Sequence, residues 1–283
     1  MSVDNFIPEL TAAEVQTEFA ADLVFINSFT AKPAGSDTIR SGNAVKIINA
    51  ARPTVQDYKA QGRTVTPEDL EGTDVTVLID QEKATSVWVD DVDAAQAAGD
   101  LSQWTDEMAP ALAEDSEAYA LLSAARDAVQ GSTDALSTDA KFDTACLEAV
   151  SLANAAKVPV SGRKIFVLPG AVPRALSFLA KSPSGQAATG EELREGKLGR
   201  IYGFELLSSA AVPAELATTA GIIAYHEKSA AYVGQIDKTQ AVRPHNSFKD
   251  AVSALLVYGF KVIRPTTVFA IGFTKPVDGE PSA

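Results

Sequence analysis

The spacing of apolar residues along the chain changes near residue 90. Val87 and Val89 alternate with Ser86 and Trp88, which is typical of a half-buried β-strand. Beyond an acidic turn, apolar residues recur at steps of three and four, which is typical of one face of an α-helix. They are Leu101, Trp104, Met108, Leu112, Tyr119, Leu122 and Val129. A helix over this stretch has about 30 residues and is about 45 Å long. Since a compact domain of this chain length has a radius of gyration of only about 19 Å, the pattern predicts an extended rod.

One residue conflicts with this helix. Pro110 lies inside the apolar pattern, and an interior proline costs about 3 kcal/mol. We therefore expect the helix to kink at Pro110 or to begin near it. Trp104 and Met108 could form a ligand-binding stripe, but at helical spacing they are interpreted as core residues.

Two strands are predicted before the rod, at residues 44–49 and 74–80, as opposite sides of one β-hairpin. The polar, turn-rich stretch 52–72 between them has few apolar residues to bury. Arms of about 12 residues reach about 40 Å, and an isolated two-stranded hairpin is marginally stable in water. The hairpin therefore needs a neighbouring surface.

The remaining pattern predicts a mixture of helices and strands, which indicates a mixed α/β unit. A helix over 141–157 has one apolar face, formed by Phe142, Cys146, Ala149, Ala153 and Ala156. The other elements are a short helix within 9–20, a strand at 163–169, a helix at 173–181, a loop at 182–199, strand character at 200–212, a strand at 222–225, a helix or turn at 228–236, and two strands within 248–273 on either side of Arg264 and Pro265.

Composition and charge restrict the class of protein. The chain has 283 residues, 46% of them hydrophobic, which suits one large or two ordinary folded domains. No apolar run is long enough to span a bilayer, and the first residues lack the pattern of a secretory signal, so we expect a cytoplasmic protein without a membrane segment. The formal charge of −13 opposes adhesion to nucleic acid. Any association with DNA is therefore expected to be enclosure.

Residues with catalytic or metal-binding chemistry are sparse. A single cysteine, Cys146, excludes an internal disulfide, and with two histidines it cannot form a Cys/His metal cluster. His226 and His245 have no sequence signature of a catalytic pair and are interpreted as surface or interface residues. The stretch 190–197 differs from a phosphate loop, because its glycine spacing is one residue too long and Leu198 replaces the required Ser or Thr.

An acidic cluster follows the strand at residue 90. Asp90, Asp91 and Asp93 could bind a hard cation, but they lack the pattern of a calcium loop and are interpreted as a helix start. We therefore nominate no catalytic, cofactor-binding or metal-binding residue, and no cofactor.

Five segments, in order, resemble the major capsid proteins of tailed bacteriophages. They are FIPEL at 6–10, NAVKIINAARPTVQDY at 43–58, TVLIDQEKATSVWVDDVDAAQA at 76–97, LGRIYGFEL at 198–206 and VYGFKVIRPTTVFAI at 257–271. Each motif alone is weakly specific, whereas five in sequence span nearly the whole chain.

The resemblance implies an α+β fold of the Hong Kong 97 type. It divides the chain into an N-terminal arm, an extended β-hairpin loop, a peripheral domain with a long spine helix, an axial α/β domain and a tail. The corresponding residues are 1–34, 35–80, 81–131 with 251–275, 132–250 and 276–283.

The resemblance also implies a structural protein and not an enzyme. Its copies would assemble into hexamers and pentamers of an icosahedral virion shell that encloses double-stranded phage DNA without reading its sequence. Assembly would take place in the cytoplasm of the host bacterium, with portal, scaffolding and decoration proteins as further partners. The hairpin, a free arm and the rod would bury their apolar faces on other copies.

The sequence shows no clear sign of two features found in some members of this family, a fused scaffolding segment and a covalent cross-link between subunits. The chain begins almost directly at the arm, so any scaffolding segment is expected to be a separate protein. Some members link subunits through a Lys–Asn bond. Lys59 is the one lysine we nominate for it, without a matching Asn or catalytic Glu.

Two other functions remain open at this stage. An encapsulin-like compartment would house an enzyme instead of a genome, and its cargo would distinguish it. A soluble α/β enzyme is the less favoured reading, because the sequence shows no set of residues to fill an active site.

Overall fold

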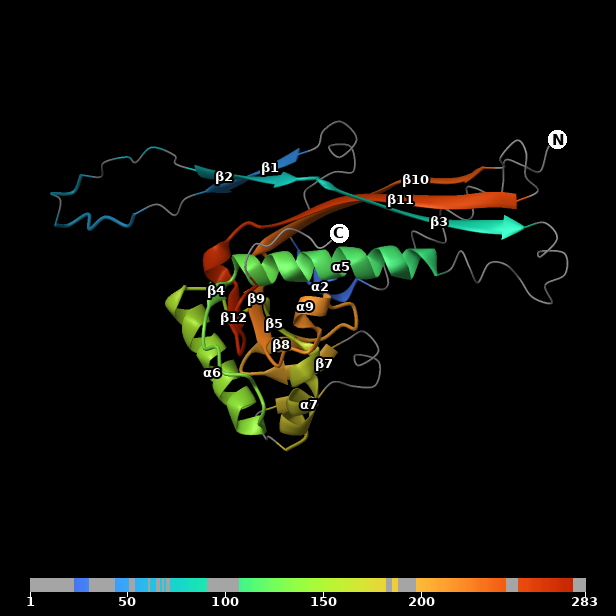
Figure 1. Ribbon diagram of the computed structural model, residues 1–283. Coiled ribbons are helices and arrows are strands. Elements are labelled where there is room, and N and C mark those ends of the chain that lie inside the picture. Colours follow the sequence, from blue (N-terminus) through green and yellow to red (C-terminus); the bar gives the residue numbers. More distant parts are fainter. Residues whose placement is uncertain are drawn as a thin grey trace.

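The computed structural model describes residues 23–30, 44–50, 54–60, 62–64, 67, 69, 72–90, 107–181, 185–187, 197–242 and 249–276. Within them a helix-and-sheet body carries one long helix, and a three-stranded sheet lies on the far side of that helix (Figure 1). A two-stranded hairpin projects sideways beyond both.

The body is built on a seven-stranded mixed sheet. Its strands run in the order β4-β12-β9-β5-β8-β7-β6. Their bounds are β4 Val129–Gln130, β5 Arg163–Val167, β6 Gly185–Ala187, β7 Lys197–Ile201, β8 Phe204–Leu207, β9 Ile222–His226 and β12 Phe269–Ile271. The central strands are buried along their length, as expected for strands covered on both faces. The helices of the body are α6 Asp139–Ala155, α7 Val172–Lys181, α9 Ala214–Ala217 and the 3₁₀ turn η3 Pro169–Ala171.

The second sheet is antiparallel and long. Strands β10 (Ala230–Val242) and β11 (Lys249–Val262) pair with each other, and β3 (Gln81–Asp90) pairs with the other edge of β11. A strand of 14 residues reaches about 46 Å. After β11 the chain turns through η4 (Pro265–Thr267) into β12, which confirms the two strands around a corner that the sequence predicts.

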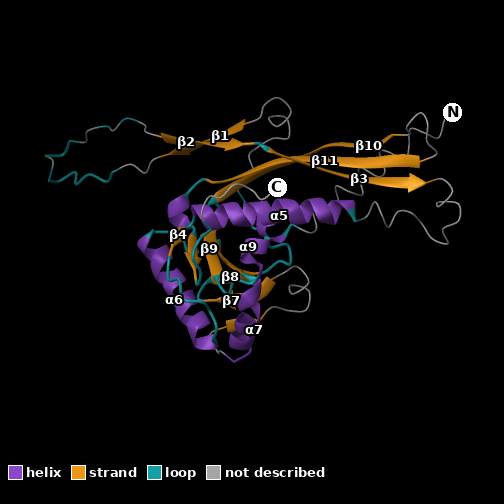
Figure 2. Ribbon diagram, viewed as in Figure 1, coloured by secondary structure: helices purple, strands orange, loops and turns teal. Residues whose placement is uncertain are grey.

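The long helix α5 (Met108–Asp127) lies between the three-stranded sheet and the body (Figure 2). Its buried residues come in adjacent pairs every four positions, from Met108 and Ala109 to Ala124 and Ala125. Half of them are alanines, which let the helix approach both layers closely. Met108 and Leu112 pack against the sheet, whereas Ala120 and Leu121 pack in the core of the body.

The rod is shorter than the apolar pattern predicts. α5 has 20 residues, about 30 Å, and Val129 belongs to β4 instead. Pro110 stands in the first helical turn, where the missing N–H costs nothing, so the helix begins near it without a kink. Leu122 is only half-buried. Leu101 and Trp104 lie outside the described residues.

Three local predictions are wrong. Residues 228–236 were expected as a helix or turn, but only 228–229 lie in the turn that precedes β10. The strand begins at Ala230, because pairing with β11 decides the conformation of the remaining residues. The stretch 182–199, expected as a loop, contains β6 and the start of β7. Ala156 is exposed beyond the end of α6, while the rest of the predicted apolar face is buried. The short helix expected within residues 9–20 lies outside the described residues.

Candidate assembly surfaces

The hairpin consists of β1 (Ala44–Ala50) and β2 (Gly72–Leu78), paired antiparallel with Ala44 opposite Leu78. This confirms that the two predicted strands are sides of one hairpin, although each has seven residues and not about 12. Val45 and Val77 pack in a small cluster with Ala231, Val233 and Ile263. In the described part of the hairpin, the apolar contacts with the rest of the chain therefore lie towards its base, where Ile47 and Val75 also pack against this cluster.

A glycine permits this anchoring. A Cβ built on Gly259 of β11 would lie 1.9 Å from the carbonyl oxygen of Leu78. Because the obstacle is backbone, a side chain here cannot be accommodated by a change of rotamer. The hairpin leaves the sheet by passing directly over Gly259.

The described part of the hairpin tip is a structured turn with exposed apolar side chains. The Asp57 carboxylate accepts the backbone N–H groups of Lys59 and Ala60 at 3.0 and 3.1 Å. Val55 is 95% exposed and Tyr58 is 54% exposed. In Figure 1 this tip lies far to one side of the body. An apolar tip held away from the chain's own core is a surface that another molecule can cover.

Residues 23–30, which we name the docked segment, pack inside their own chain. Leu23, Phe25, Ile26 and Phe29 are buried in the core cluster that also holds the inner face of α5. The expectation of a free arm is therefore wrong for these eight residues. The rest of 1–34 lies outside the described residues.

The docked segment is fixed to α5 by Glu117. This side chain is 0% exposed, and its carboxylate accepts the backbone N–H of Phe25 at 2.8 Å and that of Val24 at 3.1 Å. Sequence analysis missed both partners. Two features of the sequence could have indicated this contact. One is the largely apolar stretch 23–29, and the other is a single acidic residue on the alanine-rich face of the helix.

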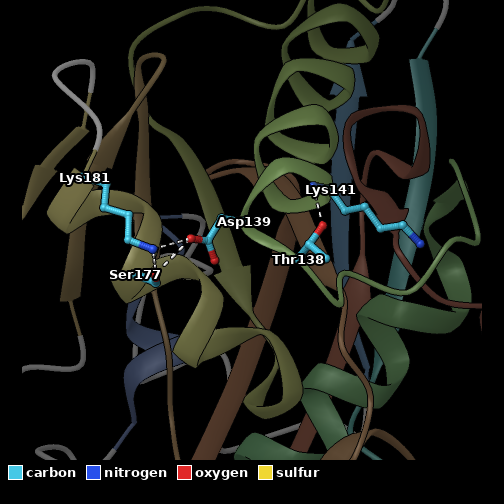
Figure 3. Close-up of polar contacts among 5 residues, drawn as sticks. All are labelled: Thr138, Asp139, Lys141, Ser177 and Lys181. Atoms are coloured by element: carbon cyan, nitrogen blue, oxygen red, sulfur yellow. Dashed lines mark hydrogen bonds and ion pairs between the residues drawn. The ribbon is translucent and has the colours of Figure 1, made fainter.

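Helices α6 and α7 are joined by polar contacts at one end of the body (Figure 3). Asp139 accepts hydrogen bonds from Lys181 Nζ and Ser177 Oγ, each at 2.9 Å. The Lys181 contact, followed by that of Ser177, lowers the pKa of Asp139. Thr138 Oγ1 caps α6 by accepting the Lys141 N–H at 3.3 Å. The outer faces of these helices expose Leu147 and Leu176.

His226 is a buried residue that holds a turn together. Nδ1 accepts the Lys228 N–H at 3.1 Å, so the proton lies on Nε2, which is 2.9 Å from the Ser161 carbonyl oxygen. The expectation of a surface or interface histidine is wrong for His226, and His245 lies outside the described residues. His226 lines a pocket of ≈ 420 Å³ whose other lining residues are mostly polar. Two of them, Ser229 and Thr267, bond each other at 2.7 Å.

The other candidates for chemistry are equally inert where the structure describes them. Burial raises the pKa of the Cys146 thiol, which disfavours the reactive thiolate. Among the described residues, no three His, Cys, Asp or Glu side chains gather to hold a metal ion. Asp90 ends β3, and Asp91 and Asp93 lie outside the described residues. No helix in the described part of the chain is long and apolar enough to cross a membrane.

Comparison with known proteins identifies the kind of assembly. No protein-family model matches the sequence, and no curated protein does. Among solved structures, one of Mycobacterium phage Che8 is 32% identical, covers 90% of this chain and 92% of that chain, and has a TM-score of 0.72. The capsid of the Cyanophage P-SCSP1u is 15% identical over 82% of this chain and 83% of that chain, with a TM-score of 0.62. A virus-like particle from Pyrococcus furiosus is 10% identical over 94% and 99% of the two chains, with a TM-score of 0.61.

These similarities define a shell-forming coat protein. The chain belongs to the major capsid proteins of tailed bacteriophages, which confirms the resemblance of its five motifs. It is a structural component of a virion, and its copies assemble with one another into a shell.

Proposed function

We propose that this chain builds an icosahedral shell of the Hong Kong 97 type from hexamers and pentamers, and that the shell encloses double-stranded phage DNA. One observation carries the proposal. Within its described residues, the hairpin β1–β2 packs on its own chain near its base, and its tip exposes Val55 and Tyr58 away from the chain's own core. Such a projection is stabilised when the tip lies on a neighbouring copy, and repeated contacts of this head-to-tail kind close into rings.

The proposed division of the chain cuts across its sheets at three strands. β4 and β12 lie in the peripheral segments but pair within the seven-stranded sheet, and β10 lies within 132–250 but pairs with β11. Residues 35–80 supply the extended loop, 81–131 and 251–275 the peripheral domain with α5 as its spine, and 132–250 the axial domain. We assign β10 to the peripheral part, because it pairs with β11 and not with the body. Residues 1–34 form the N-terminal arm, of which residues 23–30 are docked on the chain's own spine helix.

The charge supports enclosure of DNA over adhesion to it. A formal charge of −13 gives little electrostatic affinity for phosphates. A weakly interacting wall suits a genome that must later leave the shell. The host cytoplasm is the proposed place of assembly, with portal, scaffolding and decoration proteins as partners.

An encapsulin-like compartment is the second candidate. The likeness to the virus-like particle from Pyrococcus furiosus favours it, but at 10% identity this likeness shows the fold alone. The two candidates differ in what the particles contain. Nuclease-protected DNA in particles from infected cells supports the virion shell, whereas a protein cargo supports the compartment.

Electron microscopy of the purified full-length chain tests the proposal. We expect closed particles, or rings of six and five copies, by negative stain and light scattering. A protein that remains a monomer at all concentrations, with the hairpin amides protected from exchange, would overturn the proposal.

A further inference from the structure

The contact between Glu117 and the docked segment is the one place in the described structure where a buried carboxylate holds the backbone of a distant segment. Glu117 lies in the middle of α5. Its Oε1 accepts the N–H groups of Val24 and Phe25 at 3.1 and 2.8 Å, and its Oε2 accepts that of Ile26 at 3.3 Å. These N–H groups open the short helix α2 (Val24–Asn27), where they have no helical partner of their own. Glu117 therefore caps α2 from 91 to 93 residues away.

The rest of the docked segment is held by contacts that are insensitive to pH near neutrality. Ser28 Oγ lies 2.7 Å from the Tyr225 hydroxyl, and Lys164 Nζ donates to the Ser28 carbonyl at 2.6 Å. Phe25 and Phe29 stack against the aromatic rings of the core, which are those of Phe166, Tyr225 and Phe260. Residues 23–30 carry no ionisable side chain themselves.

The electrostatics of this site make Glu117 the group that changes charge. Burial raises the pKa of Glu117 to about 7, against the opposing effect of the backbone N–H groups and of Ser209. Among the described residues, Tyr225 on β9 and Tyr232 on β10 are the titratable groups that face it from other elements, and burial raises the pKa of both hydroxyls. Both tyrosines therefore stay neutral where Glu117 titrates. Lys164 on β5 is a cation that contacts the segment, through the Ser28 carbonyl.

We propose that Glu117 and the docked segment form a proton-controlled latch. With Glu117 protonated, the segment is held tightly in the groove beside α5. When Glu117 loses its proton, a buried charge opposes the same docking, and the segment is released more often.

The direction of the pH effect follows from linkage. The docked state binds the proton more tightly than the released state, in which the pKa returns to its ordinary value of 4.5. Docking is therefore strongest below pH 4.5, weakens as the pH rises towards 7, and levels off above it. Between pH 5.5 and pH 8.5 these two pKa values weaken docking about 30-fold. The latch goes beyond the proposed function and does not rest on it, because docking takes place within one subunit.

Hydrogen–deuterium exchange on the purified full-length chain tests the latch. The amides of Val24, Phe25 and Ile26 are followed from pH 5.5 to pH 8.5, with each rate corrected for the intrinsic effect of pH. We expect their protection to fall about 30-fold and to level off above pH 7. Amides within α6 serve as the internal reference and should not follow this curve. A flat or rising curve for the docked segment would refute the latch.

Two variants locate the effect. Glu117→Gln resembles the protonated side chain and is expected to abolish the pH dependence while the segment stays docked. Glu148→Gln is the matched control, because Glu148 accepts the Ser132 N–H at 2.9 Å at an exposed position, and it should keep the full dependence. The proposal fails if, in Glu117→Gln, the amides of the docked segment show the same pH dependence of exchange as in the wild type. If Glu117→Gln does not fold, infrared spectra of the wild type with ¹³C-labelled glutamate decide, since the latch requires a protonated carboxyl that titrates near pH 7.

Discussion

At the scale of single residues, Gly259 sets the path of the hairpin. Replacing it with alanine adds a Cβ that would lie only 1.9 Å from the carbonyl oxygen of Leu78, far inside van der Waals contact. The backbone of β2 must then move, and overpacking of this kind costs about 1–3 kcal/mol. We expect Gly259→Ala to lower the free energy of unfolding of unassembled subunits by this amount, measured in urea, and to speed amide exchange in β1 and β2.

The control for this change is Ser253→Ala in the same strand. Ser253 already has a Cβ, and its hydroxyl bonds Ser86 at an exposed site, so its loss should change stability by less than about 0.5 kcal/mol. If Gly259→Ala leaves the hairpin amides and the stability unchanged, the crossing over β11 is not as close as described.

His226 provides a second prediction at this scale. Replacement by phenylalanine removes the hydrogen bonds of His226 to the Lys228 N–H and the Ser161 carbonyl, which are part-buried, and each such bond contributes about 0.5–1.5 kcal/mol. His226→Asn keeps an acceptor near the Nδ1 position and should lose less. Urea unfolding of both variants measures the difference. Equal stability of the two would show that the Lys228 bond contributes nothing.

At the scale of elements, the sequence predicts those whose pattern is local. The apolar face of α6 repeats at helical spacing through Phe142, Cys146 and Ala149, and all three are buried. The strands β1 and β2 are equally visible from alternation and flanking turns. β10 was missed because Gly234 and the double alanine at 230–231 weaken its alternation, and only the distant partner β11 makes it a strand.

The docked segment was missed for a related reason. Its burial depends on Glu117, Tyr225 and Phe260, which lie far away in sequence. Local spacing at 23–29 indicates an apolar segment, but it does not specify whether the segment covers its own core or another copy. The family resemblance favoured the second interpretation, and packing of these residues inside their own chain corrects it.

The start of α6 supplies a prediction for one element. Thr138→Ala removes the side-chain oxygen that accepts the Lys141 N–H, and loss of an N-cap costs about 1 kcal/mol. Thr138→Ser keeps the hydroxyl and should retain most of the stability. The midpoint of urea unfolding measures both variants. Identical midpoints for Ala and Ser would mean that the cap contributes nothing to α6.

At the scale of the whole molecule, the described structure buries the apolar side chains of one part of the chain and exposes those of another. The body and the docked segment bury their apolar side chains internally, as a self-sufficient domain does. The hairpin tip does the opposite, since a structured turn holds Val55 and Tyr58 in solvent. An internally packed body therefore carries a projection whose apolar side chains are exposed. In a capsid protein, that surface is where a neighbour is expected to bind.

Substitutions at the tip should therefore separate assembly from folding. Val55→Asp combined with Tyr58→Asp places two charges where the proposal requires burial against another copy, and an unpaired buried charge costs several kcal/mol. We expect the fraction of subunits in particles, measured by sedimentation and negative stain, to fall at least about tenfold, which corresponds to about 1.4 kcal/mol per contact. Stability of the isolated subunit should change by less than about 0.5 kcal/mol, because both side chains are exposed there.

The matched control is Val55→Thr with Tyr58→Phe, which keeps the shape of the tip without adding charge and should still assemble. This pair of variants distinguishes the two explanations of an apolar tip. If the aspartate variant forms particles as readily as the wild type, the tip remains in solvent within the shell, and the contact that joins neighbours must lie elsewhere, for example on the exposed faces of α6 and α7 with Leu147 and Leu176. If only the aspartate variant fails, the hairpin is the element that makes one subunit incomplete without the next.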